Sequence, residues 1–143
     1  MRTNRVVPTL VAFLLMTASA CRGATEPDPL VGTWLASTFR ITPAGQPERD
    51  VLATGGTLGL NIARADSTFI TTGTVVVPAS VTGSAALKAS LAGSAIRTND
   101  VVRFTPTADS FVRGLVFTLV ENRLEAVNQV VAGTSYNVIL TRQ

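Results

Sequence analysis

The sequence predicts an all-β domain, a single antiparallel up-and-down barrel of eight strands, preceded by an export signal. From Leu30 onward apolar residues recur at every second position in short runs rich in β-branched residues, as strands with one buried face require. Glycine, asparagine, aspartate and proline divide these runs, which is typical of tight turns between neighbouring strands. Closure into a barrel would leave no exposed sheet edge.

Composition limits the classes of function. The chain has 143 residues, with a single cysteine and no histidine, which excludes an internal disulfide, the usual zinc ligand sets and imidazole catalysis. Of the 12 basic residues, Arg2 and Arg5 belong to the leader, and the others are scattered singly among nine acidic residues. Because such scattering makes no phosphate-binding face, we expect no nucleic-acid partner.

Residues 1–20 predict a signal peptide. Arg2 and Arg5 form a basic start, residues 6–16 are mostly apolar, and the segment ends in the small residues 17–20. The alternative, a transmembrane helix, needs roughly 20 apolar residues, and this run is shorter and lacks a stop-transfer charge cluster.

Cys21 follows the leader directly. The segment Ala18-Ser19-Ala20-Cys21 resembles the bacterial lipobox, whose cysteine receives a diacylglyceryl thioether. The resemblance implies a membrane anchor at Cys21, and in a Gram-negative cell Arg22 implies sorting to the outer membrane, with the domain facing the periplasm. The lipobox usually has leucine where Ala18 stands, and the ordinary secretory peptidase also fits, so cleavage after Ala20 to give a secreted protein is the alternative.

The rest of the chain divides into a tether and one domain. Residues 21–29 comprise the cysteine and a segment rich in proline and charge, which predicts a flexible tether without packing. Residues 30–143 have the length of a single domain.

The strands are expected wherever the alternation is clear. It is clearest around Leu60, Phe117 and Val138, each flanked two positions away on both sides by apolar residues. The predicted strands cover residues 31–41, 55–64, 67–78, 80–91, 99–106, 111–120, 123–130 and 134–142.

The connections are expected to be short, with one exception. Turns are predicted at residues 65–66, 99–100, 107–110 and 121–122, so consecutive strands should pair as antiparallel neighbours. Residues 41–50 contain two prolines, a glycine and three charges, which predicts a longer loop over one mouth of the barrel.

Residues 84–96 are ambiguous. Leu87, Leu91 and Ala95 are four apart, as on a helix, whereas Leu87, Ala89 and Leu91 alternate, as on a strand. We interpret the segment as strand.

At Gly32-Thr33-Trp34 the sequence resembles the lipocalins and the smaller bacterial lipocalin-like lipoproteins, in which Gly-x-Trp opens the first strand. The resemblance covers the lipobox, the tether, this motif, the run of short strands and the final Leu140-Thr141-Arg142. It implies an eight-stranded barrel in which Trp34 closes one end and Arg142 packs across its ring. The alternative is another all-β fold, such as a sandwich, in which the tryptophan is a core residue.

We expect no enzyme, metal site or cofactor. Lys88, the one lysine, lies between apolar residues and is interpreted as a solvated strand residue. Aspartates at positions 50, 66, 100 and 109 fall at predicted loops or turns, where their own backbone hydrogen bonding favours them. The calcium-loop and phosphate-loop patterns are absent from the sequence.

Binding is the function that remains. An eight-stranded barrel has room for packed side chains or one small ligand. The first hypothesis is that Phe69, Phe104, Phe117 and Tyr136 line a cavity for a small apolar molecule or lipid. The alternative is that they fill the interior, in which case the outer surface or the loops would contact another envelope protein.

Overall fold

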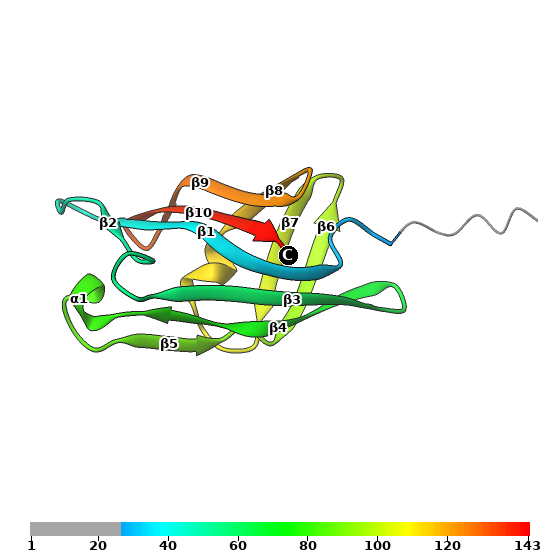
Figure 1. Ribbon diagram of the computed structural model, residues 1–143, viewed down its shortest axis with the longest axis horizontal. Helices are drawn as coiled ribbons and strands as arrows, with labels where there is room; N and C mark the ends of the chain where they lie inside the picture. Colours follow the sequence, from blue (N-terminus) through cyan, green and yellow to red (C-terminus); the bar gives the residue numbers. More distant parts are fainter. Residues whose placement is uncertain (1–26) are drawn as a thin grey trace, which may run out of the picture.

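The computed structural model of this chain describes residues 27–143. The predicted signal peptide and Cys21 lie outside these residues. The described chain forms a closed, all-antiparallel, up-and-down barrel of eight strands, as the alternation predicts (Figure 1). We call each of the eight strand positions around the barrel a wall.

Ten strand segments and two short helical turns build this barrel. In chain order they are β1 (Gly32–Pro43), β2 (Arg49–Asp50), β3 (Thr57–Ala65), β4 (Thr68–Val77), α1 (Ala79–Thr82), β5 (Leu87–Ser90), β6 (Gly93–Thr98), β7 (Val101–Pro106), η1 (Phe111–Gly114), β8 (Val116–Val120), β9 (Arg123–Val131) and β10 (Thr134–Arg142).

Each wall pairs with its neighbours in the order β1, β3, β4, β6, β7, β8, β9 and β10, and β10 returns to pair with β1. The closing pair is long: its register runs from Trp34 opposite Arg142 to Pro43 opposite Thr134. Because the first and last strands meet, the barrel has no free edge between them.

One wall is made of two segments. β4 pairs with β5 through Thr74–Val77 and with β6 through Phe69–Thr71, so β5 and β6 together form the fourth wall. Gly73 lies at the change of partner, with its backbone at φ 144°, and its carbonyl oxygen accepts a hydrogen bond from the Leu91 backbone N–H.

The predicted strand at 80–91 is therefore wrong in its first half. Residues 79–82 form the single turn α1, which follows Pro78 and ends at Gly83 in the left-handed conformation. Proline fixes φ at the start of a helical turn and glycine ends it without strain. The strand is displaced along the chain, and β6, which was not predicted as a separate element, completes the wall.

The predicted strand at 111–120 is also wrong at its start. Residues 111–114 form the 3-10 turn η1, and the strand begins only at Val116. Val112 in η1 is buried, so this turn packs inward against the barrel.

The hairpin turns occur close to the predicted positions. Asp66, Asn99 and Glu121 begin two-residue connections with φ between 54° and 56°, the left-handed backbone that twisted hairpins favour. These three turns lie at one end of the barrel, together with the point where the described chain begins (Figure 1). We call it the tether end.

The opposite end carries the longer connections. They are residues 44–56, which include β2, residues 78–86, which include α1, residues 107–115, which include η1, and the β9–β10 turn (Figure 1). We call it the loop end. The first of these connections confirms the predicted long loop, which folds inward at the fully buried Val51.

The barrel interior is filled by side chains. Trp34, Phe39 and Phe117 are fully buried, and the core forms one continuous apolar cluster. Phe104 and Phe117 pack edge to face, with ring centroids 5.2 Å apart. Large side chains thus occupy the middle of the barrel, and space for a ligand is restricted to its ends.

Candidate functional site

A pocket of about 240 Å³ opens at the loop end of the barrel. Strands from opposite sides of the barrel contribute to it, together with both helical turns. Most of the lining is apolar, and the side chains are Ile41, Pro43, Val77, Val81, Thr82, Leu87, Phe111, Thr134 and Tyr136.

A row of three aromatic rings stands at one side of the pocket, where Phe111 and Tyr136 line it and the third ring, that of Phe39, is fully buried. Phe111 stacks on Tyr136, with ring centroids 4.5 Å apart and planes 8° from parallel, and it lies 5.7 Å from Phe39. The η1 turn presents Phe111 to this row. Arg113 holds the turn down, because its guanidinium donates to the carbonyl oxygen of Pro106. A flat apolar ligand could lie against this row and keep the contacts that aromatic rings prefer.

Tyr136 supplies the one phenol of the chain, at the edge of the pocket. Burial raises the pKa of this phenol above its usual value of 10.0, and a hydrogen bond with Thr134 partly offsets the increase. The phenol therefore stays protonated at neutral pH and can both donate and accept a hydrogen bond. With Thr82 and Thr134, it gives an apolar pocket a few neutral polar groups.

We expect the titration of Tyr136 to move to higher pH in the folded protein. Phenolate absorbance reports this residue alone, because the chain has one tyrosine. Since the folded pKa is above the unfolded value of 10.0, the contribution of Tyr136 to stability is present below pH 10 and lost as the pH rises above it. Titration in buffer and in denaturing urea gives the comparison.

Tyr136→Phe should abolish the absorbance change and reduce the loss of stability above pH 10. Coinciding folded and unfolded titration curves would contradict the burial of the phenol.

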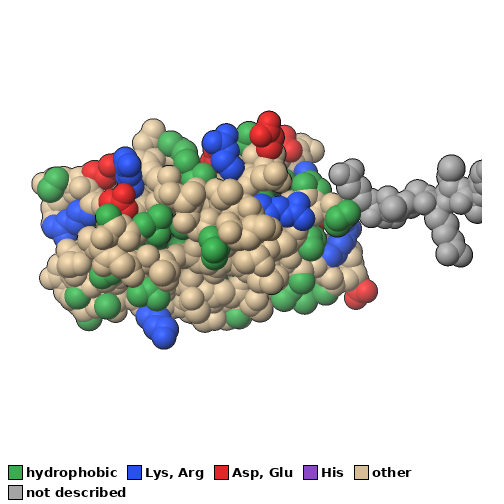
Figure 2. Space-filling view, in the orientation of Figure 1, with side chains coloured by type: hydrophobic (Ala, Val, Ile, Leu, Met, Phe, Trp, Pro, Cys, Tyr) green, Lys and Arg blue, Asp and Glu red, His purple; other side chains and the backbone are tan. Residues whose placement is uncertain are grey.

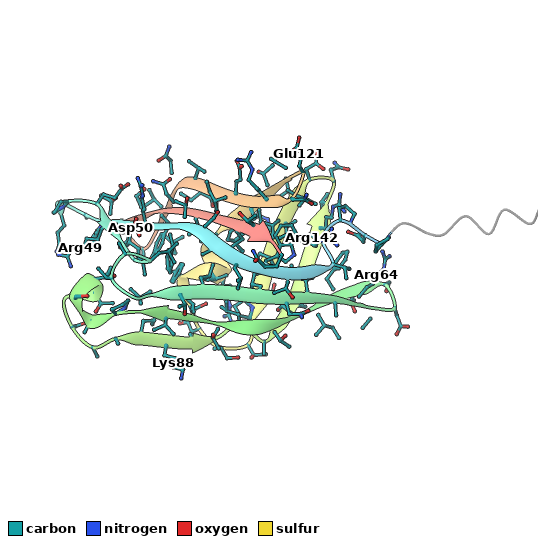
Figure 3. All side chains as sticks on the ribbon, viewed as in Figure 1. Arg49, Asp50, Arg64, Lys88, Glu121 and Arg142 are labelled. Atoms are coloured by element: carbon teal, nitrogen blue, oxygen red, sulfur yellow. The ribbon has the colours of Figure 1, made fainter. Side chains whose placement is uncertain are left out.

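An arginine ties two connections together beside the pocket. Arg49, at the loop end in Figure 3, donates to the carbonyl oxygens of Val81 at 2.6 Å and Ser80 at 3.2 Å. Its other guanidinium nitrogen donates to the Gln46 side chain at 2.9 Å. These bonds join the β1–β3 connection to α1, and α1 contributes Val81 to the pocket.

The four aromatic residues expected to line a cavity lie in three different places. Tyr136 lines the pocket. Phe104 and Phe117 pack against each other in the core. Phe69 lies toward the tether end, where the guanidinium of Arg64 stands 5.6 Å from its ring centroid.

The remaining pocket residues were not identified from the sequence. Most of them occupy alternating strand positions, which predict only burial; examples are Ile41, Val77 and Leu87. Phe111 and Val81 lie in the two helical turns that were assigned to strands. For α1 a signal existed, since Pro78 and Gly83 bracket it.

Trp34 and Arg142 are opposite each other in the register of β1 and β10. The Trp34 ring is fully buried, and its indole N–H donates to the carbonyl oxygen of Leu30 at 2.9 Å. The Arg142 guanidinium lies over Gly32, where a Cβ atom would be 2.9 Å from Arg142 Nε. Arg142 is labelled in Figure 3.

The end of the predicted tether contacts the barrel. The carboxylate of Asp28 accepts a hydrogen bond from the Leu30 backbone N–H at 2.9 Å. It also pairs with Arg97 at 2.8 Å and with Arg64 at 3.5 Å. The absence of packing expected for residues 22–29 therefore does not hold for the segment that begins at Pro27.

We expect Asp28→Ala to lower the free energy of unfolding by about 1.5–3 kcal/mol, the range for hydrogen bonds to charged groups. The carboxylate is only 17% exposed and its partner Arg97 only 23%, so solvent screens this pair weakly. Urea unfolding measures the change.

Asp100→Ala is the matched control. Asp100 lies 3.9 Å from the same Arg97 but is 73% exposed, so its loss should cost less than about 1 kcal/mol. Equal effects of the two variants would show that Asp28 does not fix the chain to the barrel.

The remaining side chains that could take part in catalysis or metal binding lie apart from one another. Lys88 is exposed on β5 and points away from the barrel in Figure 3. The Asp50 carboxylate accepts the backbone N–H of Ala53 in the β1–β3 connection. Within residues 27–143, His, Cys, Asp and Glu side chains nowhere gather in the groups of three that could hold a metal ion.

Across the described part of the chain, neither helical element is long and apolar enough to span a bilayer. The face seen in Figure 2 carries isolated hydrophobic side chains interspersed with basic and acidic ones.

Comparison of the chain with protein-family models, with curated proteins and with solved structures found no match in any of the three.

Proposed function

We propose that this protein is an exported, lipid-anchored, lipocalin-like barrel that binds a small apolar molecule, without catalysis, in the pocket at its loop end. The observation that carries the proposal is the stacked pair of Phe111 and Tyr136 in a pocket with otherwise mainly aliphatic walls. Anchoring at Cys21 rests on the lipobox resemblance, and the barrel is compatible with a lipocalin-like domain.

The pocket limits the size of the ligand. A volume of about 240 Å³ lies just below the range of about 300–1,000 Å³ that drug-sized ligands occupy. The filled core beneath leaves no deeper room along the barrel axis. The ligand class is therefore a compact aromatic or short aliphatic molecule, or one end of a lipid chain whose remainder stays outside.

A second function, envelope interaction without a ligand, is favoured by the same filled core. A domain whose interior is occupied by its own side chains offers its loops and outer surface to a protein partner. The two functions predict different contents of the loop-end pocket.

The test uses N-phenyl-1-naphthylamine, a compact apolar dye that fluoresces when it leaves water. We expect saturable binding at one dye per chain. Leu87→Trp should weaken binding at least tenfold, because Leu87 is a partly exposed lining residue and the larger ring fills the pocket. Unchanged dye affinity in this variant would refute binding at the loop end.

Leu35→Trp provides the control. It makes the same substitution at an exposed position of β1 that does not line the pocket, so dye binding should not change. Native mass spectrometry of protein from its own membranes then separates the two functions. A stoichiometric small molecule supports ligand binding, whereas a chain that takes up neither dye nor ligand supports the interaction domain.

Anchoring is tested separately. Cys21→Ser should move the protein from the membrane fraction to the soluble fraction. A wild-type chain that is already soluble would favour cleavage after Ala20 by the secretory peptidase.

A further inference from the structure

Four exposed apolar side chains gather on the outer face of the barrel near the tether end. Ile70, Ile96, Val101 and Val120 belong to β4, β6, β7 and β8, which are consecutive walls. Each lies within three residues of a hairpin turn at the tether end. We call these four side chains the apolar rim.

The rim faces solvent and not the core. Ile96 is 62% exposed, whereas its neighbour Ala95 is buried, and Val101 likewise precedes the buried Val102. Because alternate strand residues point to opposite faces, the rim residues project outward from the barrel. Large exposed aliphatic side chains grouped on adjacent strands indicate a surface that is covered when the protein works.

A basic side chain accompanies the rim. Arg103 is exposed on β7 directly opposite Ile96, and no acidic group of residues 27–143 lies within ion-pair distance of it. An arginine beside aliphatic side chains matches a phospholipid surface, where its stem lies against apolar groups and its guanidinium reaches a phosphate. The acidic Asp100 and Glu121 occupy the neighbouring turns, so this end of the barrel is not cationic as a whole. The match to a phospholipid surface therefore depends on the aliphatic side chains together with Arg103.

The path of the chain also indicates that a phospholipid surface covers the rim. Asp28 pairs with Arg97, which follows Ile96 on β6 and points to the opposite face, so the described chain begins at the same end of the barrel as the rim. Six residue steps separate Pro27 from Cys21. Six steps span at most about 22 Å even when fully extended. A lipid attached at Cys21 therefore holds the tether end, and with it the rim, close to the bilayer.

We propose that the apolar rim and Arg103 rest on the phospholipid surface, so that the barrel stands on its tether end with the loop-end pocket facing away. This docking rests on the proposed anchor at Cys21. Shallow insertion of aliphatic side chains beside a basic group is how peripheral elements bind a membrane interface. A pocket held away from the bilayer exchanges its ligand with the aqueous compartment.

The test places a tryptophan in the rim of the full chain. Ile96→Trp and the control Val130→Trp both alter strongly exposed side chains, at 62% and 69%, and Val130 lies on β9, outside the rim. Each acylated protein is reconstituted into vesicles of phosphatidylethanolamine and phosphatidylglycerol that contain brominated phospholipid. The buried Trp34 gives the background, measured in the wild-type protein.

We expect bromine to quench the tryptophan at position 96 at least twice as strongly as that at position 130, and Arg103→Glu to reduce the difference. Equal quenching at the two positions, with acylation confirmed by intact mass, would overturn the docking and leave the anchor standing. A mass without acyl groups would overturn both. Shielding of position 96 in native envelopes but not in vesicles would identify a protein partner and refute lipid docking.

Discussion

Trp34→Ala should lower the free energy of unfolding by about 3–5 kcal/mol, the range for removing a large buried aromatic side chain. The ring is fully buried at the tether end, and its N–H donates a hydrogen bond to the carbonyl oxygen of Leu30. The variant leaves both a cavity and an unpaired acceptor, and both are costly in a core. Because Trp34 is the only tryptophan, urea unfolding is followed by circular dichroism.

Two variants separate these contributions. Trp34→Phe keeps a ring but loses the hydrogen bond, and it should cost about 1–3 kcal/mol, the penalty for an unsatisfied buried acceptor. Leu35→Ala changes the next residue, which is 47% exposed, and should stay within about 0.5 kcal/mol of wild type. If Trp34→Ala cost no more than Leu35→Ala, the tether end would not depend on this ring.

Gly73→Ala should destabilise the barrel by about 2–6 kcal/mol, because backbone strain and overpacking each cost about 1–3 kcal/mol. At φ 144° the backbone of Gly73 is in a region that residues with a side chain avoid. A Cβ atom there would stand 2.1 Å from the carbonyl oxygen of Gly59 on β3. Neither group can move without breaking the β3–β4 ladder.

Gly45→Ala isolates the contribution of backbone strain, without overpacking. Gly45 also has a positive φ, 70°, but nothing lies within 4 Å of its would-be Cβ atom. Its replacement should cost about 1 kcal/mol, the penalty for left-handed backbone alone. Urea unfolding of the two variants compares them directly, and similar costs would show that β4 and β3 can separate at Gly73.

The sequence predicts the barrel well because alternation is a local signal. Runs such as those centred on Leu60 and Val138 indicate which face of a strand is buried. Residues such as Asn99 and Glu121 indicate turns between strands. The fourth wall was misplaced because alanine and serine, which dominate residues 84–95, give little contrast between faces. Pro78 and Gly83, which bracket α1, are the local signal for the helical turn in this segment.

The candidate site is less predictable because it depends on contacts between distant residues. Phe111 meets Tyr136 only because η1 folds inward, and nothing in the residues around Phe111 distinguishes it from a strand residue. Asp28 and Arg97 are 69 positions apart and meet only in the closed barrel. Alternation identifies which side chains enter a barrel but not which of them fill its middle and which remain at an end.

Because the first strand pairs with the last, the barrel closes late in folding. Side-chain bonds across this seam, such as that from Ser37 to Ile139, join residues 102 positions apart. Contacts of such long range form slowly, because a large loop must close before they contribute. While β10 is missing, β1 has no partner on one side, and the growing chain cannot complete its fold. Late closure would keep the barrel open until its last strand has been made, which is compatible with the export proposed above.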